Sequence, residues 1–185
     1  MAHFLRRVKG LGWLKRRFSI TPTTEEPKAT KPVYSLEPKH SYLVKEERAE
    51  KCFEIFADQV THGIEGLCIS RKHPEILKEK YGLIKIPKLW LTMEIAENSI
   101  SPTNLTLLTL TIRDFIDKTE NGIILLDGIG YLLLNNSFES VVRTLEGITD
   151  LIMRSKTRFL VSINQKMLSP KEFAIISRNL EEVGT

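Results

Sequence analysis

From residue 40 onward, the chain alternates between two hydrophobic patterns. Short apolar runs such as "SYLV", "GLCIS", "IILLD" and "RFLVSI" have the length of buried β-strands. The segments between them, such as "EERAEKCFEIFADQVTHG" and "SFESVVRTLEGITDLIMRSK", carry apolar residues three or four positions apart, which is the helical period. Alternating strands and helices predict βαβ units, and strands that are apolar on both faces need helices on both sides. We therefore predict an α/β three-layer sandwich with a mainly parallel sheet.

Proline and glycine mark the ends of several predicted elements. "HPEILKEKYG" has Pro74 near its start and Gly82 at its end, which is typical of a short helix. "SPTNLTLLTLTIRDFIDKTENG" predicts a helix that opens with Ser101 as its cap, and "SPKEFAIISRNLEEV" predicts another helix with a Ser-Pro start. "LIKI" and "KLWLT", on either side of Pro87, predict short strands or strand fragments.

Composition divides the chain of 185 residues into three regions. Residues 1–18, "MAHFLRRVKGLGWLKRRF", form a basic arm without any acidic residue. Residues 19–39 are rich in Pro and Thr and show no helical or strand period, so we expect a semi-extended linker. Residues 40–185 form the α/β domain.

Charge is distributed unevenly among these regions. Of the 27 basic and 23 acidic residues, eight Lys or Arg and three Glu fall within residues 1–37, a net charge of +5. The rest of the chain holds 19 basic and 20 acidic residues, a net charge of −1. Such an asymmetric basic tail is typical of contact with nucleic acid or with an acidic membrane surface.

The arm is weakly amphipathic when it is placed on a helix. Its apolar face consists of Phe4, Val8, Leu11, Leu14 and Phe18. Two glycines weaken this helix by about 1 kcal/mol each relative to Ala, so we expect the arm to fold on a partner. The residues predicted to bind RNA or the ribosome are Arg6, Arg7, Lys9, Trp13, Lys15, Arg16 and Arg17.

Three interpretations of the arm remain open. In the first, the arm binds structured RNA, above all ribosomal RNA, through phosphate contacts and base stacking. In the second, it lies on an anionic membrane surface. In the third, it is a solvated tail or docks on its own domain. RNA is favoured over a membrane because Arg7 and Lys15 interrupt the apolar face, and because a long tether suits an arm that enters a large assembly.

The apolar run that ends at Asp127 resembles the strand of nucleotide-hydrolysing enzymes whose terminal Asp holds a magnesium-bound water. Such enzymes also need G-x-x-x-x-G-K-[ST] after an early strand, and the chain has no such run. The nearest candidate, after "GLCIS", has Arg71, Lys72 and His73 at a predicted helix start, which suits an anion but has no glycine. We therefore expect Asp127 to cap the following turn, and we expect neither catalysis nor a cofactor. A small-ligand pocket formed by Arg71, Lys72 and Asp127, at strand ends that also include Ser70 and Asn164, is the alternative.

Metal chemistry has no support in the residue spacing. Cys52, His62, Cys68 and His73 match no finger or ribbon pattern. Cys52 lies on the apolar face of a predicted helix and Cys68 within a predicted strand, so we expect both to be core residues.

No apolar stretch approaches the roughly 18 residues of a membrane span, and the N-terminus lacks the apolar core of a secretory signal. We expect a cytoplasmic protein.

Several segments of the domain resemble an archaeal family known as domain of unknown function 835. They include "SYLVKE", "GLCISRKHPE", "SISPTNL", "LLDGIGYLLLNNSF" and the final "SPKEFAIISRNLEE", and together they cover about residues 40–183. The resemblance implies an α/β domain distantly similar to RecA- and KaiC-type cores, and it implies no established activity. Residues 1–39 lie outside it.

Together these observations predict a non-catalytic adaptor. The domain would form a symmetric homodimer, and the arm would dock on an RNA-rich particle, with the ribosome or a ribosomal subunit as the best candidate. A silencing, storage or ribosome-dimerisation role fits this layout. The alternatives are a sensory or signalling module with a degenerate nucleotide-binding fold, and a protein tethered to a membrane surface through its arm.

Overall fold

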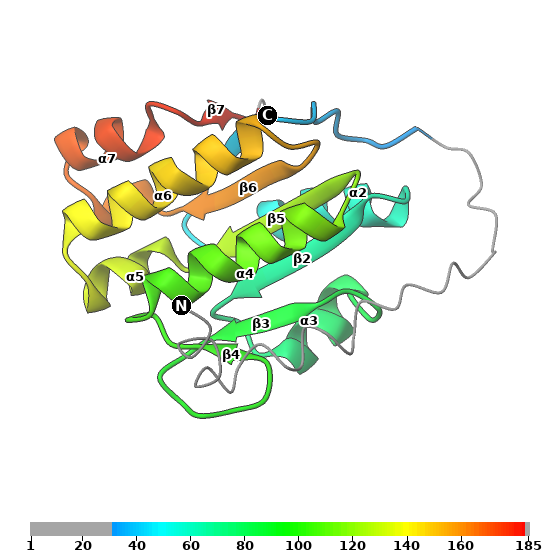
Figure 1. Ribbon diagram of the computed structural model, residues 1–185, viewed down its shortest axis with the longest axis horizontal. Coiled ribbons are helices and arrows are strands. Elements are labelled where there is room, and N and C mark those ends of the chain that lie inside the picture. Colours follow the sequence, from blue (N-terminus) through cyan, green and yellow to red (C-terminus); the bar gives the residue numbers. More distant parts are fainter. Residues whose placement is uncertain (1–30, 184–185) are drawn as a thin grey trace, which may run out of the picture.

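The computed structural model describes residues 31–183, which form one sheet covered by helices (Figure 1). The strands are β1 (Ser41–Lys45), β2 (Glu65–Ser70), β3 (Lys88–Leu91), β4 (Ser99–Ile100), β5 (Gly122–Asp127), β6 (Arg158–Ile163) and β7 (Glu181–Glu182). The α-helices are α2 (Lys51–Thr61), α3 (Pro74–Tyr81), α4 (Leu105–Lys118), α5 (Ile129–Asn135), α6 (Phe138–Met153) and α7 (Pro170–Ser177), and a short 3₁₀ helix, η1, spans Gln165–Met167.

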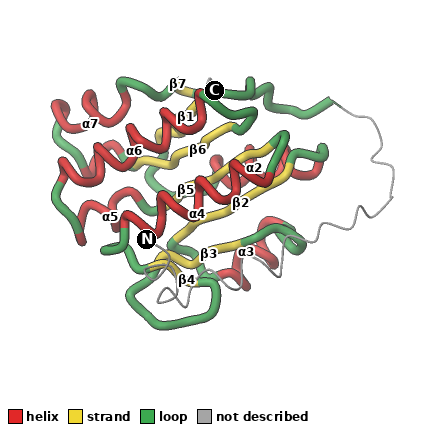
Figure 2. Tube along the Cα trace, viewed as in Figure 1, coloured by secondary structure: helices red, strands yellow, loops and turns green. Residues whose placement is uncertain are grey.

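All seven strands run parallel, in the order β4-β3-β2-β5-β6-β1-β7. Helices α2 and α3 cover one face of the sheet, and α4, α5 and α6 cover the other (Figure 2). The predicted three-layer α/β sandwich is therefore confirmed. Because every strand points the same way, the strand starts gather at one edge of the sheet, the amino edge, and the strand ends at the opposite edge, the carboxyl edge.

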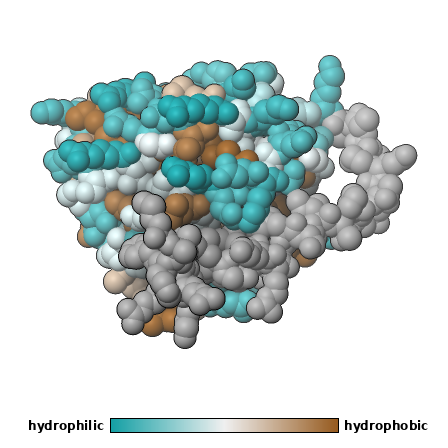
Figure 3. All heavy atoms as spheres, viewed as in Figure 1, coloured by the Kyte–Doolittle hydropathy of each residue, from teal (hydrophilic) through white to brown (hydrophobic). Residues whose placement is uncertain are grey.

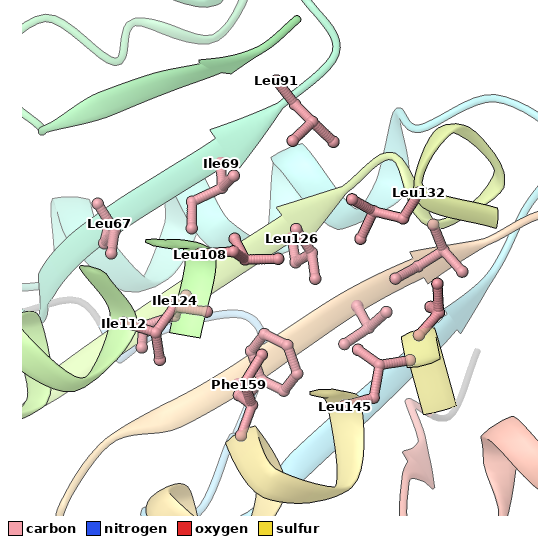
Figure 4. Packing of buried hydrophobic residues seen from close by; sticks show 14 of the residues in the cluster. Leu67, Ile69, Leu91, Leu108, Ile112, Ile124, Leu126, Leu132, Leu145 and Phe159 are labelled. Carbon is pink, nitrogen blue, oxygen red and sulfur yellow. The ribbon is translucent and has the colours of Figure 1, made fainter. Parts of the chain in front are cut away.

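The central strand β5 shows why its sequence is apolar throughout. Ile123 and Leu125 pack in the core beneath α2 and α3, whereas Ile124 and Leu126 pack in the core beneath α4, α5 and α6. Side chains alternate between the faces of a strand, so a strand with helices on both sides must be apolar at every position. Figure 4 shows the second core, in which Leu67, Ile69 and Phe159 of neighbouring strands meet Leu108, Ile112 and Leu145 of the helices. Hydrophilic residues with smaller hydrophobic areas cover the outside of these helices (Figure 3).

Several predicted element boundaries are wrong. Helix α2 begins at Lys51 and not in the preceding "EERAE" segment, which forms a loop. Helix α4 is capped by Asn104, whose side chain accepts a hydrogen bond from the Leu107 amide, and Ser101 lies before it. The predicted strand "LIKI" is a loop, in which the Leu83 and Ile86 carbonyls accept hydrogen bonds from the Lys88 ammonium at 2.5 and 2.8 Å.

The C-terminal segment also differs from its prediction as one helix. Helix α7 begins as expected with a capping box, in which the side chains of Ser169 and Glu172 each accept a hydrogen bond from the other's backbone amide. It ends at Ser177, and the chain then forms the edge strand β7, which pairs with β1. The prediction failed because two exposed glutamates carry no strand pattern.

Residues 33–38, which we call the strap, are fastened to the domain at its amino edge. The Val33 and Tyr34 amides donate to the Asp58 carboxylate at 3.2 and 3.1 Å. The Arg158 guanidinium, which is buried, donates to the Leu36 carbonyl at 2.6 Å. Leu36 is itself buried. The last residues of the predicted linker therefore leave the domain from a defined point.

Candidate functional site

Polar side chains line the carboxyl edge where β1, β6, β5 and β2 end. Asp127, the last residue of β5, is in register with Ser162 of β6 on one side, and its carboxylate accepts a hydrogen bond from the Ser70 hydroxyl of β2 at 2.7 Å on the other. The Ser70 hydroxyl in turn accepts from the Lys72 amide at 2.9 Å. These hydrogen bonds link the strand ends to the loop that leads into α3.

A single carboxylate, that of Glu46, satisfies the start of helix α2. It accepts hydrogen bonds from the Glu50 and Lys51 amides at 2.9 Å each and from the Cys52 amide at 3.3 Å. It also accepts from the Ser162 hydroxyl at 2.8 Å. The N-cap residue of α2 makes no side-chain capping bond of its own, so the Glu46 carboxylate accepts hydrogen bonds from amides that would otherwise lack a partner.

This arrangement has a chemical consequence for anion binding. Exposed amides at the start of a helix, after a strand, form the geometry that holds phosphate groups in nucleotide-binding proteins. In this chain a carboxylate of the protein already occupies that position, and its charge repels a second anion. The loop after β1 is therefore a filled anion site. The predicted anion site was placed only in the loop after β2, so this one was missed.

The loop after β2 does carry the predicted cations at a helix start. His73 is the N-cap of α3, and its Nδ1 accepts from the Glu75 amide at 3.3 Å. The Arg71 guanidinium donates to the Leu91 carbonyl at 2.7 Å and stacks over the Tyr131 ring at 3.9 Å. Arg71 is thus held against the protein. The structure brings Arg71, Lys72 and Asp127 to one edge, as predicted from the strand ends.

Asp127 does not cap the following turn, contrary to the prediction. The N-cap of α5 is Gly128, which has a φ of 128° and makes no side-chain cap bond, while the Asp127 carboxylate turns back towards β2. Burial raises the pKa of Asp127, and the Ser70 hydrogen bond and the charge of Lys72 oppose that rise. Asp127 therefore acts as an acceptor that joins two strand ends.

Two aromatic residues complete the edge. The Trp90 indole nitrogen donates to the Arg71 carbonyl at 3.2 Å, and the His73 ring meets the Trp90 ring edge-on with centroids 5.0 Å apart. The fold brings both Trp90 and Tyr131 to Arg71, an arrangement that no sequence spacing indicates.

The thiols are core groups, as predicted. Cys52 and Cys68 are both completely buried, and burial raises the pKa of each thiol. Within residues 31–183, no three His, Cys, Asp or Glu side chains are grouped so as to hold a metal ion. Asn164 caps the short η1 helix by accepting from the Lys166 amide at 3.0 Å.

An open groove lies between α6 and α7. Its volume is about 590 Å³, with Phe138, Val142 and Ile175 as its apolar part and Glu139, Arg143 and Lys171 among its charged residues. None of the residues predicted for a ligand pocket lines it. The residues predicted to bind RNA, all within residues 1–18, lie outside the part of the chain that the structure describes.

Residues 45–180 match the model of a protein family described as "Protein of unknown function (DUF835)". A search of curated proteins finds no match. Among the helices of residues 31–183, none has the length and apolar character to cross a membrane. The family match covers most of the chain, so the chain belongs to the DUF835 family.

Proposed function

We propose that this protein is a non-catalytic cytoplasmic adaptor whose basic arm docks on an RNA-rich particle, with the ribosome or one of its subunits as the particle. The domain would serve as the protein–protein surface and would form a symmetric homodimer. Two arms on one dimer would then bridge two particles or block a site on each, as in silencing, storage or dimerisation of ribosomes.

The observation that carries the proposal is the separation of charge from the folded domain. The net charge of +5 lies within residues 1–37, and the remainder carries −1. Phosphate contacts supply most of the affinity of non-specific nucleic-acid binding, and Lys and Arg provide them. A domain of nearly neutral net charge adds less to this electrostatic attraction than the arm, so we expect the arm to supply most of it.

The Glu46 carboxylate supports the non-catalytic part of the proposal. Open α/β sheets bind ligands at the carboxyl ends of their strands. At this edge the amides of α2 bind Glu46, and Arg71 is held by the Leu91 carbonyl and the Tyr131 ring. The groups that would recognise a nucleotide phosphate are therefore already used by the protein.

The strap supports the separation of arm and domain. Asp58 and Arg158 hold it at the amino edge, at the opposite end of the strands from Glu46 and Asp127. The 14 linker residues before it, 19–32, would reach at most about 50 Å when fully extended. The strap is thus the point of the domain from which that reach is counted, and it lies at the amino edge.

Sedimentation of cell extract on a sucrose gradient at low salt tests the proposal. The protein should sediment with a ribosomal subunit or with whole ribosomes, and ribonuclease treatment should release it. A protein that stays at the top of the gradient would refute the proposal. A protein that pellets with anionic vesicles in place of ribosomes would favour the membrane tether.

Point variants distinguish the two ways in which the arm would bind RNA. Changing Arg6, Arg7, Arg16 or Arg17 to Ala should lower the slope of log affinity against log salt by about 0.7–0.9 for each phosphate that the variant no longer binds. Trp13→Ala should cost about 1–3 kcal/mol with little change in that slope if the ring stacks on a base. Binding of purified subunits at several salt concentrations measures both effects. A slope that none of the arginine variants changes would contradict phosphate binding by the arm.

The second candidate function is a sensory module that binds a small ligand at the carboxyl edge. The buried carboxyl of Asp127, whose pKa is raised by burial, favours it because such groups occur at ligand sites. A thermal-shift screen of the folded protein against nucleotides and metabolites tests this candidate. Stabilisation by a ligand that Asp127→Asn abolishes would support it, and no stabilisation by any of them would exclude it.

A further inference from the structure

Three cationic residues, Lys39, Arg154 and Lys156, surround the point where the strap joins the domain. The Lys39 amide donates to the Thr157 carbonyl at 2.9 Å, which sets Lys39 beside the residue that follows Lys156. Arg154 is the C-cap of α6, two residues before Lys156. In Figure 1 the blue strap and the C-terminal end of α6 lie on the same side of the molecule. We call these three residues the edge patch.

The charges of the edge patch are available to a partner. All three residues are exposed, and within residues 31–183 none of their side chains makes an ion pair. By contrast, Lys45, Lys78, Lys80 and Lys166 are each paired with a glutamate. Along the chain, Glu37 lies two residues before Lys39 and Asp150 four residues before Arg154, and the Glu181 carboxylate lies 3.4 Å from the His40 ring.

The backbone beneath the edge patch is firmly held. Arg158, which follows Thr157, donates to the Leu36 carbonyl at 2.6 Å and to the Asn121 side chain at 2.7 Å. The Thr157 amide donates to the Ser155 hydroxyl at 3.0 Å, so the turn that carries Lys156 is closed on itself. The three cations therefore extend from a preformed surface, and ordering them costs only their side-chain entropy.

We propose that the edge patch is a second binding surface for the phosphate backbone of the RNA that the arm binds. The inference rests on the proposed function, and the strap, which precedes Lys39 in the chain, is fastened to the domain beside these three residues. Lys and Arg bind phosphates as positive charges without reading a base sequence. No aromatic residue belongs to the edge patch, so this surface would add affinity and orientation and no sequence preference. An RNA held by the arm would then lie along the amino edge of the sheet.

The test uses the full chain with Lys39→Gln, Arg154→Gln and Lys156→Gln combined. The matched control combines Arg48→Gln, Arg143→Gln and Lys171→Gln, which removes the same three charges from exposed positions outside the patch that also make no ion pair within residues 31–183. Binding of each protein to purified ribosomal subunits and to naked ribosomal RNA is measured between about 50 and 200 mM salt, the range in which phosphate binding depends steeply on salt. Circular dichroism and thermal unfolding check that both variants remain folded.

The patch variant should bind more weakly than the control, with a smaller salt slope. Each removed charge that bound a phosphate should lower the slope by about 0.7–0.9, so the fall in affinity over this fourfold rise in salt should be about threefold smaller for each such charge. Equal binding by the patch variant and the control, with wild type bound firmly, would overturn the inference and leave the proposed function intact. Failure of wild type to bind either RNA form would refute both.

Discussion

Replacing Glu46 with Ala removes the carboxylate that caps helix α2, and its cost can be worked out from the hydrogen bonds. Three backbone amides and the Ser162 hydroxyl would have no acceptor. Loss of a cap costs about 0.5–2 kcal/mol. Leaving the buried Ser162 hydroxyl without its acceptor adds about 1–3 kcal/mol when no water replaces it. We expect a decrease of about 1.5–5 kcal/mol in the free energy of unfolding, measured by urea denaturation at about 25 °C.

Two controls make this experiment specific. Glu47→Ala removes the neighbouring carboxylate, which is exposed and pairs only with Lys166 among the described residues, and should cost less than about 1 kcal/mol. Inorganic phosphate should stabilise Glu46→Ala by about 1.4 kcal/mol at tenfold its dissociation constant, because the freed amides would bind it, and should stabilise wild type less. A Glu46→Ala protein as stable as Glu47→Ala, or one on which phosphate has no more effect than on wild type, would show that Glu46 does not fill an anion site.

Three further predictions concern the edges of the sheet. Because burial raises the pKa of Asp127 in the folded protein, the folded state holds this proton to a higher pH than the unfolded state does, so the residue's contribution to stability falls as pH rises above about 4. Asp127→Asn should therefore gain stability relative to wild type as pH rises from about 4, and urea curves with parallel pH dependence would contradict this. Arg158→Leu should destabilise the domain by about 1–3 kcal/mol, because the Leu36 carbonyl would lose its donor, and should increase hydrogen exchange at residues 34–37, whereas Arg154→Leu should change neither, because only Arg158 is buried and bonded to the strap. Gly128→Ala should cost more than about 1 kcal/mol in thermal unfolding, since a Cβ at φ 128° would lie 2.9 Å from Leu91 and 3.1 Å from Arg71, and an unchanged midpoint would disprove the strain.

The sequence predicted the layers of the fold because burial leaves a local pattern. Strand β5 is apolar at Ile123 to Leu126 since helices cover both of its faces, and α6 repeats its buried positions with the helical period. The loop before α2 was missed for the opposite reason. Its "EERAE" segment continues the helical pattern, and the helix begins late because Glu46 binds Ser162, 116 residues away along the chain.

The candidate site shows the same division between local and distant causes. The strand ends were correctly placed at one edge because parallel strands put them there. The partners of each side chain were not predictable: Arg71 contacts Tyr131 and the Leu91 carbonyl, and Asp127 accepts from Ser70. The sequence did not predict the strap within its Pro-rich segment, because the attachment of the strap depends on Arg158, 122 residues beyond Leu36.

The central claim is that the arm, and not the domain, provides the main binding surface for RNA. Binding of the full chain and of a chain lacking residues 1–18 to purified ribosomal subunits, at the same low salt, tests it most directly. Because the strap is fastened to the domain independently of the arm, the shortened protein should stay folded with its oligomeric state unchanged. It should also fail to bind the subunits tightly. Full-strength binding by the shortened protein would show that the domain itself binds the subunits, and would contradict the claim.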